Sequence, residues 1–94
     1  MSANRVLLVT GGSRGIGAAT ARLAGERGYA VAVNYRANRQ AAEQVVESIA
    51  RAGGRAIAVA GDVSVEADVM RVFETVDAQL GRLDALVNNA AIVE

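Results

Sequence analysis

The chain has 94 residues, enough for one small domain and too few for two. Hydrophobic residues make up 52% of it, the formal net charge is zero and no basic block stands out, so a nucleic-acid or membrane-surface role has no electrostatic support. Cys, His and Lys are absent, and all ten cationic residues are Arg. The chain therefore has no disulfide and no zinc–thiolate site, and it cannot supply a lysine to a catalytic mechanism.

Strands and helices are predicted to alternate along the whole chain. Short apolar runs indicate strands at residues 5–10, 30–34, 55–60 and 83–88. The intervening segments have the 3.6-residue period of helices, at about 15–27, 39–52 and 65–80, the last with Ser64 as its N-cap. The expected buried positions are Ile16, Ala19, Thr20, Leu23 and Ala24 in the first helix, Ala41, Ala42, Val45, Val46 and Ile49 in the second, and Val65, Val69, Val72, Phe73, Val76 and Leu80 in the third.

This alternation predicts an α/β fold with right-handed crossovers and helices on both faces of a parallel sheet. We expect one Rossmann-like, doubly wound domain over residues 1–94, with four strands in the order 3-2-1-4 and three helices. In that order the fourth strand is an uncovered apolar edge, which parallel sheets normally avoid. The domain is therefore expected to be partial: a fragment, a chain that needs a complementary piece, or a truncated product without a stable fold.

A glycine-rich segment, Thr10-Gly11-Gly12-Ser13-Arg14-Gly15-Ile16-Gly17, joins the first strand to the first helix. Glycines permit a tight turn and a close approach to a pyrophosphate, and the helix N-terminus behind them favours an anion. The spacing is G-x-x-x-G-x-G. The alternative interpretation is a tight turn that binds no ligand.

The segment after the second strand, Asn34-Tyr35-Arg36, contains no acidic residue. Folds that bind NAD usually place an Asp or Glu there for the ribose hydroxyls, whereas those that bind NADP use an Arg nearby. Arg36, helped by Arg14, could pair with a 2′-phosphate, so NADP is the preferred cofactor and NAD the second choice. Alternatively, Arg36 and Arg39 are ordinary solvated surface residues.

Polar residues also follow the third and fourth strands. Asp62 could accept a hydrogen bond from an adenine amino group while Val63 packs on the ring, although an Asp before a helix is often only a cap. Asn88-Asn89-Ala90-Ala91 could hydrogen-bond across the sheet or face a ligand, and the structural role is the more common one.

Taken together, these segments resemble the N-terminal part of the short-chain dehydrogenase/reductase family over nearly all 94 residues. Thr10 to Gly17 resembles its T-G-x-x-x-G-x-G motif, Asp62 its adenine-contacting Asp, and Asn88 to Ala91 its N-N-A-G, with Ala91 in place of Gly. The Asn-Tyr-Arg segment is similar to that of glucose and 3-oxoacyl reductase members. The cofactor-binding residues that motifs and resemblance imply are Gly11, Ser13, Arg14, Gly15, Ile16, Gly17, Tyr35, Arg36, Asp62, Val63, Asn88 and Ala90.

The resemblance implies an oxidoreductase that transfers hydride between NADP or NAD and an unidentified small alcohol or carbonyl, with a possible homo-oligomer of the full-length parent. The scattered charges predict no nucleic-acid or membrane partner, and without a signal peptide or a membrane-spanning run the default expectation is a cytoplasmic location. The family's catalytic Ser, Tyr and Lys have no counterpart here, and no metal ligand or catalytic residue is assigned. The isolated chain is therefore expected to be inactive. The alternative is a dinucleotide-binding module or subunit without chemistry of its own. A methyltransferase is disfavoured, because it would need an acid where Arg36 stands.

Overall fold

A computed structural model describes residues 5–13 and 15–89 of the chain. The strands are β1 (Val6–Thr10), β2 (Ala30–Tyr35), β3 (Arg55–Ala60) and β4 (Ala85–Asn88), and the helices are α1 (Gly15–Glu26), α2 (Arg39–Arg51) and α3 (Glu66–Gln79). The strands form one parallel sheet in the order β3-β2-β1-β4. The predicted fold class, strand order and helix number are confirmed.

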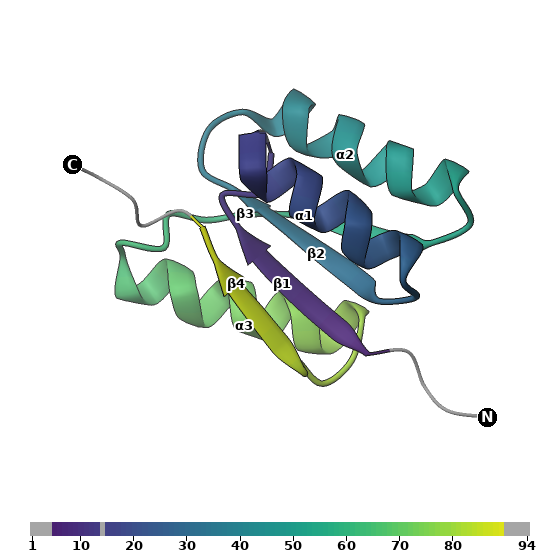
Figure 1. Cartoon of the computed structure of the whole chain (residues 1–94). Coiled ribbons are helices and arrows are strands. Elements are labelled where there is room, and N and C mark those ends of the chain that lie inside the picture. The colour runs from purple at the N-terminus through teal and green to yellow at the C-terminus, as the bar shows by residue number, and fades with distance from the viewer. Residues whose placement is uncertain (1–4, 14, 90–94) are drawn as a thin grey trace.

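The sheet separates two apolar layers, with α1 and α2 on one face and α3 on the other (Figure 1). Neighbouring residues of β1 and β2 alternate between the layers, as strand geometry requires. Leu7, Val9, Val31 and Val33 pack with α1 and α2. Val6, Leu8, Ala30 and Ala32 pack with Val72, Val76 and Leu80 of the α3 segment. Because β1 and β2 are buried on both faces, they read as continuous apolar runs in the sequence.

The predicted buried face of α1 is wrong. The helix buries Gly17, Ala18, Ala21, Ala24 and Gly25, and of the five residues expected inside only Ala24 is among them. Ile16 is 78% exposed and Leu23 50% exposed. The reason is close packing: Gly25 lies directly against Ile49 of α2, where even a Cβ atom would come within 2.8 Å of the Ile49 Cγ2. The small residues, rather than the large ones, therefore face the protein.

Two further expectations concern α2 and α3. Of the predicted apolar face of α2, Ala42, Val45 and Ile49 are buried, and Ala41 and Val46 are half-buried. The predicted N-cap Ser64 is wrong, because α3 begins at Glu66 with Val65 as its N-cap residue and no side-chain capping bond. The Ser64 hydroxyl instead donates to the Asp62 carboxylate. Within the described ranges, no helix has both the length and the apolar character needed to cross a membrane.

Candidate functional site

The carboxyl ends of all four strands meet at one edge of the sheet, because the strands are parallel. The chain passes from β1 through β2 to β3 in one direction and then returns to place β4 on the other side of β1. Such a reversal is where open α/β sheets bind their ligands. The reversal lies between β1 and β4, and the glycine-rich loop leaves the sheet there.

The loop after β1 has a backbone that glycine favours. Gly11 and Gly15 both have a φ of 63°, in the left-handed region that other residues rarely adopt. The Gly12 N–H donates to the Asn34 carbonyl at 3.0 Å, which ties the loop to β2. A Cβ on Gly15 would meet nothing within 4 Å, so no neighbouring atom crowds the position where α1 begins.

Gly17 holds the first turn of α1 tightly against this loop. A Cβ atom on Gly17 would lie 2.3 Å from the Gly11 carbonyl oxygen and 2.7 Å from the Asn89 Nδ2. Only a residue without a side chain therefore allows the helix N-terminus to sit this close to the loop. The first N–H groups of a helix have no acceptor within the helix. The arrangement therefore directs amide donors and the positive end of the helix dipole at the strand ends, which suits a pyrophosphate.

The residues between these glycines are less completely described. Ser13 is half-buried, and Ile16 presents its apolar side chain to solvent on the first turn of α1. Two predicted site residues, Arg14 and Ala90, lie outside the described residues.

At the end of β4, the two asparagines brace the sheet against the glycine loop. The Thr10 hydroxyl donates to the Asn88 Oδ1 at 3.0 Å and accepts from the Asn89 N–H at 2.9 Å. The Asn89 Nδ2 then donates to the Gly11 carbonyl at 3.2 Å. Hydrogen bonding of these asparagines across the sheet, one of the two interpretations of the sequence, is therefore present. Asn89 was not among the predicted site residues, and only its place beside Asn88 could have singled it out.

The residues after β2 diverge in environment. Tyr35 is half-buried and packs against the α1–α2 layer, whereas Arg36 is exposed. In the part of the chain that the structure describes, no ion pair engages Arg36, but Arg39 pairs with Glu43 at 2.8 Å on the surface of α2. Among the described residues, Arg36 thus offers a guanidinium that no ion pair engages, directly after β2.

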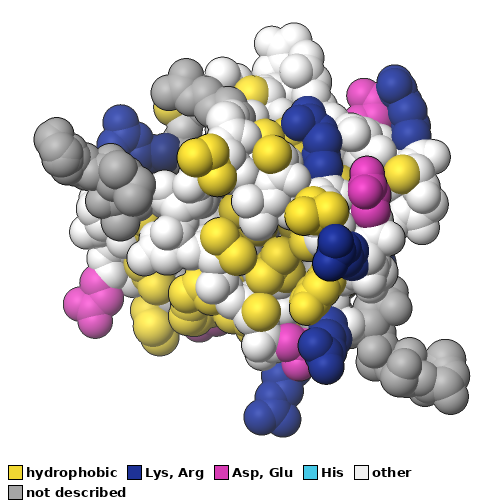
Figure 2. Space-filling view, in the orientation of Figure 1, with side chains coloured by type: hydrophobic (Ala, Val, Ile, Leu, Met, Phe, Trp, Pro, Cys, Tyr) yellow, Lys and Arg dark blue, Asp and Glu magenta, His cyan; other side chains and the backbone are white. Residues whose placement is uncertain are grey.

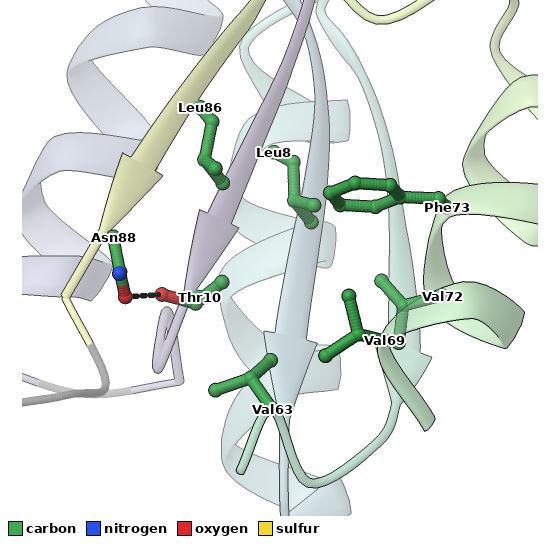
Figure 3. Close-up of a pocket in the computed structure, with 8 residues that line it drawn as sticks. All are labelled: Leu8, Thr10, Val63, Val69, Val72, Phe73, Leu86 and Asn88. Atoms are coloured by element: carbon green, nitrogen blue, oxygen red, sulfur yellow. Dashed lines mark hydrogen bonds between the residues drawn. The ribbon is translucent and has the colours of Figure 1, made fainter. Parts of the chain in front are cut away.

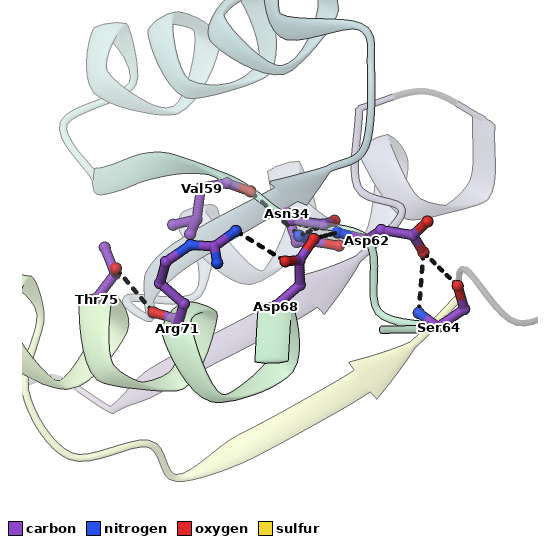
Figure 4. A network of polar contacts seen from close by, with 8 residues as sticks. Asn34, Val59, Asp62, Ser64, Asp68, Arg71 and Thr75 are labelled. Atoms are coloured by element: carbon purple, nitrogen blue, oxygen red, sulfur yellow. Dashed lines mark hydrogen bonds and ion pairs between the residues drawn. The ribbon is translucent and has the colours of Figure 1, made fainter. Parts of the chain in front are cut away.

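Asp62 lies in a network of polar contacts after β3 (Figure 4). Its Oδ1 accepts from the Ser64 N–H at 2.9 Å and the Ser64 hydroxyl at 2.7 Å. Its own N–H donates to the Asp68 Oδ2 at 2.8 Å. The hydrogen bonds from Ser64 lower the pKa of Asp62, and the positive charge of Arg36 lowers it further. Asp62 is therefore an ionised acceptor at neutral pH, and Figure 4 shows its second oxygen turned away from Ser64.

An apolar pocket of about 260 Å³ lies on the α3 side of the sheet (Figure 3). Its walls are Leu8, Thr10, Val63, Val69, Val72, Phe73, Leu86 and Asn88. It is smaller than the roughly 300–1,000 Å³ typical of small-molecule sites and has few polar groups, so it is too small to hold a whole dinucleotide. Val63 faces this pocket, while the Thr10–Asn88 bond closes it at the strand ends.

Hydrophobic side chains gather on the same face of the molecule, over β4 and α3 (Figure 2). Leu86 is 48% exposed, Phe73 42% and Met70 57%. Leu86 and Phe73 also line the apolar pocket, which reaches Thr10 and Asn88 at the strand ends.

Comparisons with known proteins agree with this geometry. A family model described as short chain dehydrogenase matches residues 5–94. An uncharacterized oxidoreductase of Escherichia coli, YgfF, is 50% identical over 88 residues, which are 94% of this chain and 36% of that protein. YusS of Bacillus subtilis, a short-chain dehydrogenase/reductase homolog, is 45% identical over 95% of this chain and 82% of its own length.

Solved structures of dehydrogenases and reductases are similar to the whole described fold. The crystal structure of a dehydrogenase/reductase from Sinorhizobium meliloti 1021 superposes with a TM-score of 0.92 at 42% identity, covering 97% of this chain and 36% of that one. The chain thus spans about a third of the length of the Escherichia coli and Sinorhizobium meliloti proteins that it matches.

Proposed function

The chain belongs to the short-chain dehydrogenase family, and on that premise we propose that it binds a nicotinamide dinucleotide across the carboxyl ends of its strands. The observation that carries the proposal is the tight contact of Gly17 with the Gly11 carbonyl and Asn89, which brings the N-terminus of α1 to the place where a pyrophosphate would bind. The protein that contains this chain is then an oxidoreductase that acts on an alcohol or a carbonyl.

Each part of the dinucleotide is assigned to one part of the strand ends. The loop of Gly11, Ser13, Gly15, Ile16 and Gly17 would hold the pyrophosphate. The adenine lies by Asp62 and Val63, where the ionised Asp62 carboxylate accepts from the amino group. The nicotinamide-side ribose lies by Asn88 and Ala90, and the adenosine ribose by Tyr35, Arg36 and Arg14.

Arg36 makes NADP the preferred cofactor and NAD the second choice. No acid stands in the Asn34-Tyr35-Arg36 segment, so nothing there repels a 2′-phosphate. Arg36 is exposed beside Asp62, whose pKa its charge lowers. A guanidinium and a phosphate form charge-assisted hydrogen bonds, which are stronger than neutral ones.

The nicotinamide, when bound, supplies or accepts the hydride. The described residues would bind and orient the cofactor: the loop amides would donate to the pyrophosphate, and the Thr10–Asn88–Asn89 contacts hold the strand ends where the nicotinamide half would bind. The family's chemistry requires a lysine, and these 94 residues contain none. We therefore propose that the isolated chain has no turnover and that its substrate, a small alcohol or carbonyl, is handled by other residues.

The missing lysine also favours a second candidate, a dinucleotide-binding module without chemistry of its own. A turnover assay on the intact protein from its native source distinguishes the two. Oxidation of NADPH by a carbonyl substrate supports the enzyme, whereas tight NADPH binding without turnover on a panel of carbonyls supports the module. A cytoplasmic location and a homo-oligomer of the intact protein belong to the same proposal, and cell fractionation and light scattering test them.

The cofactor assignment is tested by replacing Arg36 with Asp in the intact protein and titrating NADPH and NADH by calorimetry. Wild type is expected to bind NADPH at least about tenfold more tightly, since hydrogen bonds to charged groups contribute roughly 1.5–3 kcal/mol. Arg36→Asp should remove this preference and leave NADH binding within about threefold of wild type, less than 1 kcal/mol.

Arg39→Asp is the matched control, because Arg39 already pairs with Glu43 on the surface of α2. It should leave the NADPH-to-NADH ratio nearly unchanged. Equal binding of the two cofactors by wild type, or an NADH preference that Arg36→Asp does not alter, overturns the assignment of NADP. Failure of wild type to bind either dinucleotide overturns the proposed function itself.

A further inference from the structure

Asn34 is a polar side chain buried between the two loops assigned to the cofactor. It lies near the carboxyl end of β2, between β1 and β3, and is 2% exposed. Its neighbours on β2, Ala30 to Val33, are all apolar and fully buried. A buried amide among such residues is costly unless its donors and acceptor are satisfied, so its hydrogen bonds decide what it does.

The side-chain amide contacts both loops at once. Its Nδ2 donates to the Val59 carbonyl at 3.2 Å and to the Gly61 carbonyl at 3.1 Å, at the end of β3. Its Oδ1 accepts from the Gly11 N–H at 3.4 Å, in the glycine loop. The two carbonyls require the nitrogen of the amide on their side, so the oxygen necessarily faces the loop.

The segment that receives these bonds leads directly into Asp62. Gly61 fits closely here, because a Cβ atom on it would lie 2.6 Å from the Val72 Cγ2. The Asp62 N–H is held from the other side by Asp68. Asn34 and Asp68 therefore hold the two sides of one peptide unit, the Gly61 carbonyl and the Asp62 N–H, and Figure 4 shows Asn34 and Asp62 within the same network.

We propose that Asn34 is a positioning residue that holds the glycine loop and the Asp62 turn at a fixed separation, so that the pyrophosphate and the adenine of one dinucleotide are bound together. This inference rests on the proposed function. The bond to Gly11 is long for an N–H···O bond, so the amide sets the position of that loop through a weak contact, while its two donors hold the turn firmly.

The test is Asn34→Asp in the intact protein, with NAD⁺ titrated at pH 8 and at pH 5.5. The substituted side chain keeps its shape, but when ionised it presents an acceptor to the Val59 and Gly61 carbonyls. Binding of NAD⁺ at pH 8 should then weaken about tenfold or more, because two donors are lost and two carbonyls are left facing an anion.

Lowering the pH should restore binding. Burial and the facing carbonyls raise the pKa of the substituted carboxyl group toward neutrality, and once protonated it can donate to one carbonyl again. At pH 5.5 the variant should bind NAD⁺ within about threefold of wild type. The nearby acids do not interfere, because hydrogen bonds lower the pKa values of both Asp62 and Asp68, which stay ionised throughout this range.

Asn38→Asp is the matched control. The Asn38 side chain accepts from the Ala41 N–H at 3.0 Å as the exposed N-cap of α2, and Asp is an equally good cap. The NAD⁺ affinity of Asn38→Asp relative to wild type should therefore be the same at both pH values. The sequence contains no His or Cys, so wild type itself has few groups that titrate in this range.

A second variant, Asn34→Ser, separates the effect of the new charge from a general loss of structure. Asn34→Ser introduces no charge, and it should weaken NAD⁺ binding by the same factor at both pH values. A pH-independent loss in Asn34→Asp, or wild-type affinity of either variant at pH 8, overturns the inference.

Amide hydrogen exchange of the ligand-free proteins separates this inference from the proposed function. In Asn34→Ser, which removes the whole side-chain amide, exchange should speed up at Gly11 and Asp62 together while the amides of β1 stay protected. Uniform acceleration across the sheet, or acceleration in one loop alone, overturns the inference even if NAD⁺ fails to bind.

Discussion

Replacing Gly17 with Ala tests the packing of α1 against the glycine loop. The added Cβ would lie 2.3 Å from the Gly11 carbonyl oxygen, and a relaxed carbon–oxygen contact is about 3.3 Å or longer, so the loop or the helix must shift by about 1 Å. Such overpacking costs roughly 1–3 kcal/mol, and Ala regains up to about 1 kcal/mol through its higher helix propensity. With the full propensity gain, we expect a net destabilisation of up to about 2 kcal/mol.

The effect on cofactor binding should be larger than the effect on stability. The shift displaces the loop amides and strains the Asn89-to-Gly11 bond of 3.2 Å, and both form the proposed pyrophosphate site. NADPH affinity is expected to fall at least about tenfold, or 1.4 kcal/mol, in a calorimetric titration at a temperature where urea unfolding shows the variant to be folded.

Gly25→Ala is the matched control, because it makes the same change in the same helix. There the added Cβ would come within 2.8 Å of the Ile49 Cγ2, a side-chain atom far from the strand ends. This variant should lose stability to a similar degree and keep its NADPH affinity within about twofold of wild type. If both variants lose affinity equally, or Gly17→Ala loses none, the close contact at Gly17 does not build the site.

Thr10→Val is expected to destabilise the protein by about 1–2 kcal/mol in urea unfolding, since the hydroxyl that serves Asn88 and Asn89 is lost; a change below about 0.3 kcal/mol would contradict the bracing of β1 to β4. Acid should destabilise the protein through Asp62 and Asp68, whose pKa values lie below the ordinary 3.8 in the folded state. Their contribution is fully present above that value and is lost as the pH falls through the folded pKa values, so urea melts should show constant stability from pH 8 to about 5 and a decline below about 4. Asp68→Asn should make that decline shallower, and an unchanged slope would refute the role of Asp68.

The order of elements was predictable from the sequence because each depends on local pattern. Continuous apolar runs such as Val6 to Thr10 indicate strands, and the predicted strand bounds agree with the structure to within two residues. Burial on both faces is found for β1 and β2, while β3 and β4 are partly exposed. The strand order 3-2-1-4 also followed, since short right-handed crossovers leave few arrangements of four parallel strands. The glycine loop was recognisable because its spacing and its place between a strand and a helix are both visible in the chain.

The contacts inside the site were less predictable because they join residues far apart in the sequence. The Thr10–Asn88 bond spans 78 positions and the Asn34–Gly61 bond spans 27. The Asn34-Tyr35-Arg36 segment drew attention for its missing acid, yet the residue that reaches both loops is Asn34. Ser64 was misjudged for a local reason: its hydroxyl and its N–H both bind the Asp62 carboxylate, two residues earlier, in preference to the first turn of α3.

Helices α1 and α3 show why periodicity predicts an apolar face but not how much of that face is buried. In α1 the larger apolar residues Ile16 and Leu23 stay exposed because the glycines and alanines allow a closer approach of the backbones. In α3 the period was correct, yet Val72 and Val76 are buried while Phe73, one position along the same face, is 42% exposed. The difference follows from the strand order, because α3 packs over the β3, β2 and β1 side of the sheet and leaves β4 at the edge. Burial of an amphipathic helix is therefore decided by which strands lie beneath it, and that information lies in the topology of the whole sheet.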